Sequence, residues 1–142
     1  MTEFIFDTNA LLHVIAAKNY RKLNASCHIL DLTFYEYGNA MLNILANRKS
    51  NSGGVMSKDQ AMLLMQSFRE VAKLMPIIRL ESETIQPILE LAEKEKLTFY
   101  DASYLYCSLH FKCRLVTGDG KLLRAAENSG IDAIETSKWA EK

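Results

Sequence analysis

FIFDTNALLHVI, residues 4–15, changes from one secondary-structure pattern to another within a few positions. A short apolar run over 4–6 stops at Asp-Thr-Asn, residue types that cap helices, and a stretch with helical apolar spacing follows over 10–17. The segment therefore predicts a strand, a turn and a helix in close succession.

The same pattern repeats along the chain. A second apolar run over 27–32 meets Thr33, and Thr33 to Glu36 has the form of a capping box that opens a helix through about 47. The polar segment RKSNSGGV, residues 48–55, predicts a loop. Periodicity predicts further strands at 77–80, 114–117 and 131–134 and further helices at 57–74, 82–95, 98–110 and 121–128.

Five short strands that alternate with helices predict an α/β protein. Each parallel crossover needs a connection of helix length, so we expect a three-layer α/β/α sandwich around a central, mostly parallel five-stranded sheet. The chain of 142 residues, 49% of them hydrophobic, fits a single domain over 1–142.

The composition also limits the cellular setting. No apolar run approaches the roughly 20 residues of a membrane span, and no export leader is recognisable, so we expect a cytoplasmic protein without a membrane segment. The cysteines, Cys27, Cys107 and Cys113, are odd in number and form no CxxC pair, which favours reduced thiols. The spacing of the cysteines and the three histidines does not predict a zinc site.

Four acids follow predicted strands or open predicted helices. Asp7 and Asp119 lie just past the first and fourth strands, Glu36 lies in the first turn after the second strand, and Asp101 opens a helix. Sites in open parallel sheets form beyond the carboxyl ends of the strands, so all four side chains can reach one edge. Carboxylates gathered there repel one another, and Mg²⁺ or Mn²⁺ would relieve the repulsion and support phosphodiester hydrolysis.

Each acid also has a purely structural explanation. Asp7 fits a helix N-cap, and Asp119 fits a turn between two glycines. Glu36 and Asp101 fit the third position of capping boxes. The balance of seventeen basic and seventeen acidic residues is mild evidence against a nucleic-acid partner, unless several acids are gathered to hold cations.

Taken together, the motifs resemble the PIN-domain nucleases, specifically the VapC-like toxins of toxin–antitoxin pairs. The resemblance spans nearly the whole chain and is carried by FIFDTNALLHVI, LTFYEYGNAML, LTFYDASYLYCSLH and CRLVTGDGKLLRAA. It implies an α/β/α fold, an Mg²⁺- or Mn²⁺-dependent endoribonuclease, a cognate antitoxin and a homodimer. A homodimer face could come from the apolar helix over 55–75, although burial in its own core explains that pattern equally well.

The resemblance also implies roles for particular residues. The catalytic and metal-binding acids would be Asp7, Glu36, Asp101 and Asp119. Polar residues beside them that could orient carboxylates or water are Thr8, Asn9 and Thr117. Independently of the resemblance, Lys121 and Arg124 follow Asp119 within about one helical turn and are therefore candidates for contacts with RNA phosphates. For most of the tyrosines we expect packing in the core or at an interface, and the alternative is stacking on RNA bases. These tyrosines are Tyr35, Tyr37, Tyr100, Tyr104 and Tyr106.

Two other functions fit the same sequence. A catalytically inactive PIN-like module would bind RNA or a protein without cutting RNA. A receiver-like or phosphatase domain with an aspartate nucleophile also needs acids at strand ends, but Asp7 lacks the adjacent acid or Asp-x-Asp pattern expected there.

Overall fold

The computed structural model describes residues 2–47 and 57–141. Its centre is a five-stranded sheet in the order β3-β2-β1-β4-β5, and all four strand pairs are parallel. The strands are β1 (Phe4–Phe6), β2 (Cys27–Leu30), β3 (Ile77–Ile78), β4 (Arg114–Thr117) and β5 (Ala133–Glu135). The predicted five-stranded parallel sheet is confirmed.

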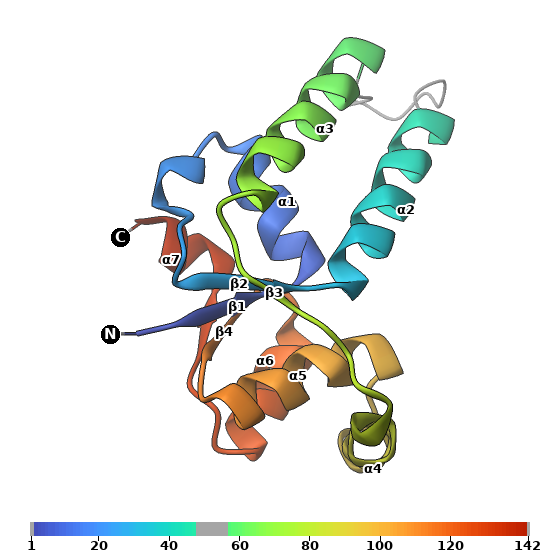
Figure 1. Cartoon of the computed structure of the whole chain (residues 1–142), viewed down its shortest axis with the longest axis vertical. Coiled ribbons are helices and arrows are strands. Elements are labelled where there is room, and N and C mark those ends of the chain that lie inside the picture. The colour runs from blue at the N-terminus through green and yellow to red at the C-terminus, as the bar shows by residue number, and fades with distance from the viewer. Residues whose placement is uncertain (1, 48–56, 142) are drawn as a thin grey trace.

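Helices cover both faces of this sheet (Figure 1). One face carries α1 (Thr8–Ala16), α2 (Leu32–Asn47), α3 (Lys58–Ala72) and α7 (Thr136–Glu141). The opposite face carries α4 (Ile85–Glu95), α5 (Phe99–Phe111) and α6 (Gly120–Asn128). The predicted three-layer α/β/α architecture is therefore confirmed.

The core has a layer on each side of the sheet because strand side chains alternate between its two faces. Phe6 and Val116 belong to the cluster beneath α1, whereas Ile5 and Leu115 belong to the cluster beneath α5. Trp139 of α7 packs edge-on against Phe6, with 4.8 Å between ring centroids. Both faces of the central strands are thus buried, as in other parallel sheets.

Several element boundaries differ from the predictions. The strand predicted over 27–32 stops at Leu30 because α2 already begins at Leu32. The helix predicted over 82–95 is a short 3₁₀ helix, Ser82–Thr84, followed by α4, whose first turn accommodates Pro87. The last strand starts two residues later than predicted, and α7 was not predicted. The predicted loop over 48–55 lies outside the described residues.

The helix predicted over 57–74 corresponds to α3, which opens with the predicted capping box between Ser57 and Gln60. None of the helices within residues 2–47 and 57–141 has the length and apolar character needed to cross a membrane.

Candidate active site

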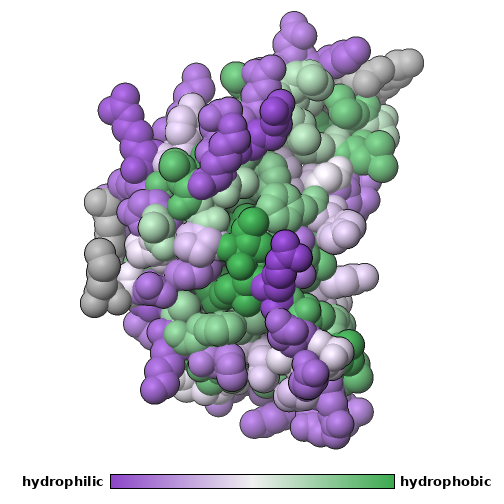
Figure 2. All heavy atoms as spheres, in the orientation of Figure 1, coloured by the Kyte–Doolittle hydropathy of each residue, from purple (hydrophilic) through white to green (hydrophobic). Residues whose placement is uncertain are grey.

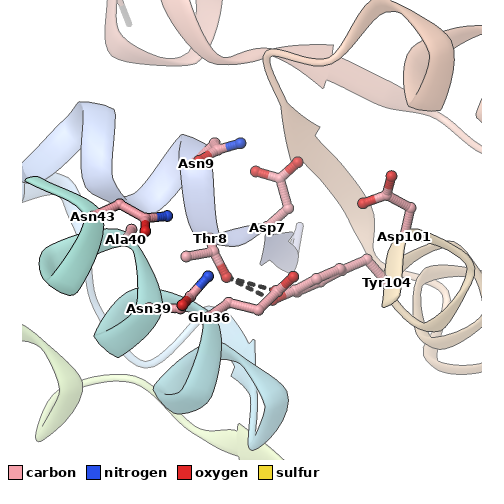
Figure 3. A pocket seen from close by; sticks show the side chains of 9 residues that line it. All are labelled: Asp7, Thr8, Asn9, Glu36, Asn39, Ala40, Asn43, Asp101 and Tyr104. Atoms are coloured by element: carbon pink, nitrogen blue, oxygen red, sulfur yellow. Dashed lines mark hydrogen bonds between the residues drawn. The ribbon is translucent and has the colours of Figure 1, made fainter. Parts of the chain in front are cut away.

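A pocket of about 250 Å³ lies at the carboxyl end of β1, between the first turns of α1 and α5 and the side of α2. Figure 3 shows its polar side chains converging from these three helices. The lining residues are Asp7, Thr8, Asn9, Glu36, Asn39, Ala40, Asn43, Asp101 and Tyr104. Three of the four predicted acids therefore line one pocket.

Asp7 is held at the junction between β1 and α1. Its backbone N–H donates to the Val116 carbonyl at 3.2 Å, which continues the sheet by one bond. Its Oδ1 accepts from the backbone N–H of Ala10 at 2.8 Å as the N-cap of α1, and its Oδ2 accepts from the Thr117 hydroxyl. The side chain is thus fixed by both neighbouring strands and by its own helix.

Burial makes the Asp7 carboxylate costly to ionise. The residue is only 7% exposed, and this burial raises its pKa to about 6. The hydrogen bonds from Thr117 and Ala10 oppose the rise, and the charges of Asp101 and Asp119 add to it. The capping and metal-binding explanations of Asp7 are therefore compatible in one geometry.

Asp101 lies in the first turn of α5. Thr98 caps this helix by accepting a hydrogen bond from the Asp101 backbone N–H at 3.1 Å, while the Asp101 carboxylate faces the pocket (Figure 3). Burial raises the pKa of Asp101, and the charges of Asp119 and Glu36 raise it further. Asp101 is therefore placed by a helix cap and lies within reach of the other acids.

Asp119 does not line the pocket. It is exposed and is the N-cap of α6, where its Oδ1 accepts from the backbone N–H groups of Lys121 at 2.9 Å and Leu122 at 3.4 Å. Its charge nevertheless raises the pKa of both Asp7 and Asp101. All four predicted acids thus gather at one end of the sheet.

Glu36 is not a capping residue. Its Oε1 accepts hydrogen bonds from the Thr8 hydroxyl at 2.8 Å and from the Tyr104 hydroxyl at 2.7 Å. The predicted capping box with Thr33 is wrong because α2 begins one residue before Thr33, which places Thr33 inside the helix. The Thr33 hydroxyl instead accepts from the backbone N–H of Leu30 at 3.2 Å.

A buried hydroxyl network orients Glu36. The Tyr104 hydroxyl lies 2.9 Å from the hydroxyls of both Thr8 and Thr33. Each hydroxyl has one proton to donate, and the hydroxyls of Thr8 and Tyr104 both donate to Glu36. In the contact between Thr33 and Tyr104, Thr33 is therefore the donor. Burial also raises the pKa of Tyr104, which keeps it a proton donor. The network ties α1, α2 and α5 together behind the acids.

The sequence interpretation missed three polar lining residues, Tyr104, Asn39 and Asn43. Tyr104 was assigned to packing or stacking, although it lies three residues after Asp101 on the same helical face. Asn39 and Asn43 follow Glu36 by three and seven residues, so helical periodicity places them on the pocket side of α2. That spacing was the available signal.

The remaining predicted residues surround the acids. Thr8 and Asn9 line the pocket, and Thr117 links Asp7 to the Asp119 backbone N–H, which donates to Thr117 Oγ1 at 3.1 Å. Lys121 is exposed, and its charge lowers the pKa of Asp101. Arg124 is also exposed and lies one turn further along α6.

The donor set fits a hard divalent cation. The pocket offers carboxylate and amide oxygens, with no thiol or imidazole among its lining residues. Two of the acids carry raised pKa values, so a cation would stabilise their ionised forms. Oxygen ligands of this kind suit Mg²⁺ or Mn²⁺ rather than Zn²⁺.

Comparisons with known proteins agree with the fold. No family model matches the chain. The chain is 32% identical over 136 residues to Exonuclease VapC9 of Pyrobaculum aerophilum, an alignment that covers 94% of this chain and 92% of that protein. It also superposes on the crystal structure of PAE2754 from Pyrobaculum aerophilum with a TM-score of 0.75 and 26% identity, over 98% of this chain and 93% of the other.

A more distant structure shares the fold alone. It is a toxin–antitoxin complex from Klebsiella pneumoniae, with a TM-score of 0.56 and 17% identity. The match covers 82% of this chain and 87% of the other.

Proposed function

This chain belongs to the VapC-like family of PIN-domain nucleases, and we propose that it is an endoribonuclease that uses Mg²⁺ or Mn²⁺ to hydrolyse RNA phosphodiester bonds. The observation that carries the proposal is the convergence of four carboxylates at one end of the sheet, two of them with raised pKa values. The residues that would hold the metal are Asp7, Glu36, Asp101 and Asp119.

The chain's own residues have distinct tasks in this mechanism. Asp7 and Asp101 present carboxylates from two helix starts, and Thr8 and Tyr104 fix the orientation of Glu36. A bound divalent ion supplies the activation of a water molecule and the neutralisation of phosphate charge. Lys121 and Arg124, in the first turns of α6, are the proposed contacts with the RNA backbone.

The proposal includes partners. Toxins of this family imply a cognate antitoxin, and the natural test is co-purification with a protein encoded beside this one.

The free, buried Cys27, Cys107 and Cys113 support a reducing, cytoplasmic setting.

Self-association is also proposed. In α3, Leu64, Phe68 and Val71 are buried in the chain's own core. Core burial therefore explains most of the apolar periodicity of this helix, without a dimer face. Figure 2 shows apolar side chains gathered near the centre of the view, where β3 forms the sheet edge. Exposed Leu74 and Ile77 belong to this edge region. We expect a homodimer, which multi-angle light scattering of the purified chain measures.

Cleavage assays test the activity. Purified protein should cut RNA with Mg²⁺ or Mn²⁺, stop cutting in EDTA, and lose activity on Asp7→Asn or Asp101→Asn substitution. Robust cleavage that survives both chelation and these substitutions would overturn the mechanism. Metal-dependent RNA binding without any cleavage would instead favour a catalytically silent PIN-like module.

A separate substrate is needed to tell whether the chain cuts within RNA or removes nucleotides from its ends, since the similar Pyrobaculum protein is named an exonuclease. A circular RNA has no ends, so only an endonuclease can open it. We expect the chain to linearise circular RNA under the conditions that cut linear RNA. Degradation of linear RNA with circular RNA left intact would show an exonuclease.

A further inference from the structure

A second group of potential metal ligands lies at the opposite, amino end of the sheet. Glu3 precedes β1, His28 lies on β2, and Cys113 precedes β4. One carboxylate oxygen, one imidazole nitrogen and the thiol sulfur of these residues all lie within 4.8 Å of one another. None of the three belongs to the pocket that holds the acids.

The register of the sheet builds this cluster. Phe4 pairs with both Cys27 and Arg114, so Glu3 stands beside Cys113, and the Arg114 backbone N–H donates to the Glu3 carbonyl at 2.8 Å. Alternation along the strands directs the side chains at 3, 28 and 113 to the same face as Ile5, Leu30 and Leu115, the face beneath α5. One ligand thus comes from β2, and the other two come from the residues that immediately precede β1 and β4.

The histidine is oriented as a metal ligand would be. Its Nδ1 lies 3.2 Å from the Phe4 carbonyl oxygen, which can only accept, so Nδ1 carries the proton and donates it. In the neutral imidazole, this tautomer leaves the lone pair of Nε2 directed toward Glu3, whose Oε2 lies 3.6 Å away. Metal-bound histidines in proteins usually have the other ring nitrogen anchored in this way.

The cluster is accessible to an ion. Glu3 and Cys113 line a hollow of about 650 Å³, whose other lining residues include Arg114 and Asp132. The Glu3 side chain is 50% exposed, and that of His28 is 15% exposed. The Cys113 thiol donates to the Phe111 carbonyl at 3.6 Å. Burial and the nearby Glu3 charge raise the pKa of this thiol, so metal binding must displace its proton, as in other zinc–thiolate sites.

We propose that Glu3, His28 and Cys113 form a transition-metal site for Zn²⁺, separate from the acid site. Mixed sulfur, nitrogen and oxygen ligands suit a borderline-soft ion, and three protein ligands leave the fourth tetrahedral position open to water. An ion held there would cross-link β1, β2 and β4 at their amino ends, which is a stabilising role. The long separations in sequence explain why ligand spacing did not predict the site.

Cobalt(II) gives a direct test because a cobalt–thiolate bond produces a near-ultraviolet charge-transfer band that carboxylates cannot produce. Titration of the metal-free full chain should give this band at one equivalent, and Zn²⁺ should abolish it. Cys113→Ser should eliminate the band. Cys107→Ser, which alters another buried thiol, should retain it.

Glu3→Gln provides a variant at an exposed position that should fold normally. It should weaken Zn²⁺ affinity about tenfold or more while leaving Mg²⁺-dependent RNA cleavage unchanged. Zn²⁺ at a hundredfold excess over its Kd should raise the Tm of the wild type by roughly 5 to 10 °C, and that of Cys113→Ser far less.

Three results would each overturn the proposal: no thiolate band in the wild type, a band that persists in Cys113→Ser, or Zn²⁺ affinity unaffected by Glu3→Gln. In those cases Glu3 and His28 form an ion pair beside an unrelated thiol. Loss of RNA cleavage bears only on the acid site, so the two proposals fail separately.

Discussion

At the residue scale, the ionisation of Asp7 links stability to the proposed metal. Its folded pKa of about 6 lies above the ordinary value of 3.8. Between these pH values the folded chain binds the proton that the unfolded chain has released, so the metal-free protein loses stability as pH rises from about 4 to 6. The shift corresponds to a loss of about 3 kcal/mol at most.

Asp7→Asn should therefore stabilise the metal-free protein at pH 8, by up to about 3 kcal/mol, and have little effect at pH 4. Urea unfolding in EDTA at the two pH values measures this difference. Mg²⁺ should stabilise the wild type at pH 8 but not the variant. Asp59→Asn, an exposed change in the first turn of α3, is the matched control and should show neither effect. Equal stability of Asp7→Asn and wild type at pH 8 would contradict the burial argument.

Tyr104→Phe removes the hydroxyl that donates to Glu36. We expect Mg²⁺ or Mn²⁺ affinity to fall about 10- to 100-fold, because groups that orient ligands contribute at this level. Folding stability should fall by about 1 to 3 kcal/mol, because Thr33 and Glu36 each lose a buried partner.

The matched control is Tyr37→Phe, whose buried hydroxyl donates to the Leu64 carbonyl at 3.1 Å, away from the acids. It should also lower stability, yet leave metal affinity unchanged. If the two variants had the same metal affinity by calorimetry, Tyr104 would have no positioning role.

Residue types alone predicted the acids but not how they are held. Asp7 and Asp101 are fixed by caps that local sequence displays, so their positions followed from strand ends and helix starts. Glu36 depends on Tyr104, which is 68 residues away in the sequence. No local pattern encodes that contact, because it forms only when the fold brings α2 and α5 together at the carboxyl end of the sheet.

At the scale of elements, the start of α6 combines a cap with a charge. Asp119 caps this helix through two backbone hydrogen bonds, and asparagine caps helices about as well as aspartate. Asp119→Asn should therefore keep the stability within a few tenths of a kcal/mol while lowering cleavage about tenfold or more.

Asp119→Ala should lose the same activity and, in addition, about 1 kcal/mol of stability. Thermal unfolding and cleavage rates of the two variants separate the contributions. Full activity in Asp119→Asn would remove Asp119 from the catalytic set and leave it a capping residue.

The basic residues of α6 offer a second test at this scale. If Lys121 and Arg124 contact RNA phosphates, alanine at either position should weaken RNA binding several-fold at low salt. The slope of log affinity against log salt concentration should also fall by about one unit. Lys138→Ala, an exposed change on α7, should alter neither quantity. Unchanged salt slopes in both α6 variants would place these side chains outside the RNA path.

Element positions were more predictable than their ends. β1 and β4 have the predicted bounds because each stops at polar residues that start a turn. The start of α2 was misplaced because Asp31, not Thr33, serves its first turn: Asp31 Oδ1 accepts from the Leu32 backbone N–H at 2.9 Å. Aspartate and threonine are both common at helix N-caps, so residue type alone did not distinguish between the two positions.

At the scale of the whole molecule, alternation of strands and helices was enough to predict the parallel sheet, but not its strand order or register. Register determines what lies at each end. It places Asp7 beside Thr117 at the carboxyl end and Glu3 beside Cys113 at the amino end. The acid site was predictable because strand ends converge in any parallel sheet, whereas the second cluster depends on the particular neighbours.

The charge balance of the whole chain yields a final prediction. Seventeen acids offset seventeen bases, and gathering four acids at the carboxyl end of the sheet leaves thirteen other acids against seventeen bases. In EDTA the four carboxylates should repel RNA phosphates, whereas a bound divalent ion removes that repulsion. RNA affinity of the wild type should therefore rise about tenfold or more on adding Ca²⁺, and fall as monovalent salt increases.

The double variant Asp7→Asn/Asp101→Asn should show the opposite pattern. With two acidic charges removed, it should bind RNA in EDTA more tightly than the wild type and gain little from Ca²⁺, because the ion has lost two ligands. Fluorescence anisotropy with a short labelled RNA measures both proteins under matched salt. If wild-type affinity did not respond to Ca²⁺, the acids would lie too far from the bound RNA to act on its phosphates, and the proposed cleavage centre would be in the wrong place.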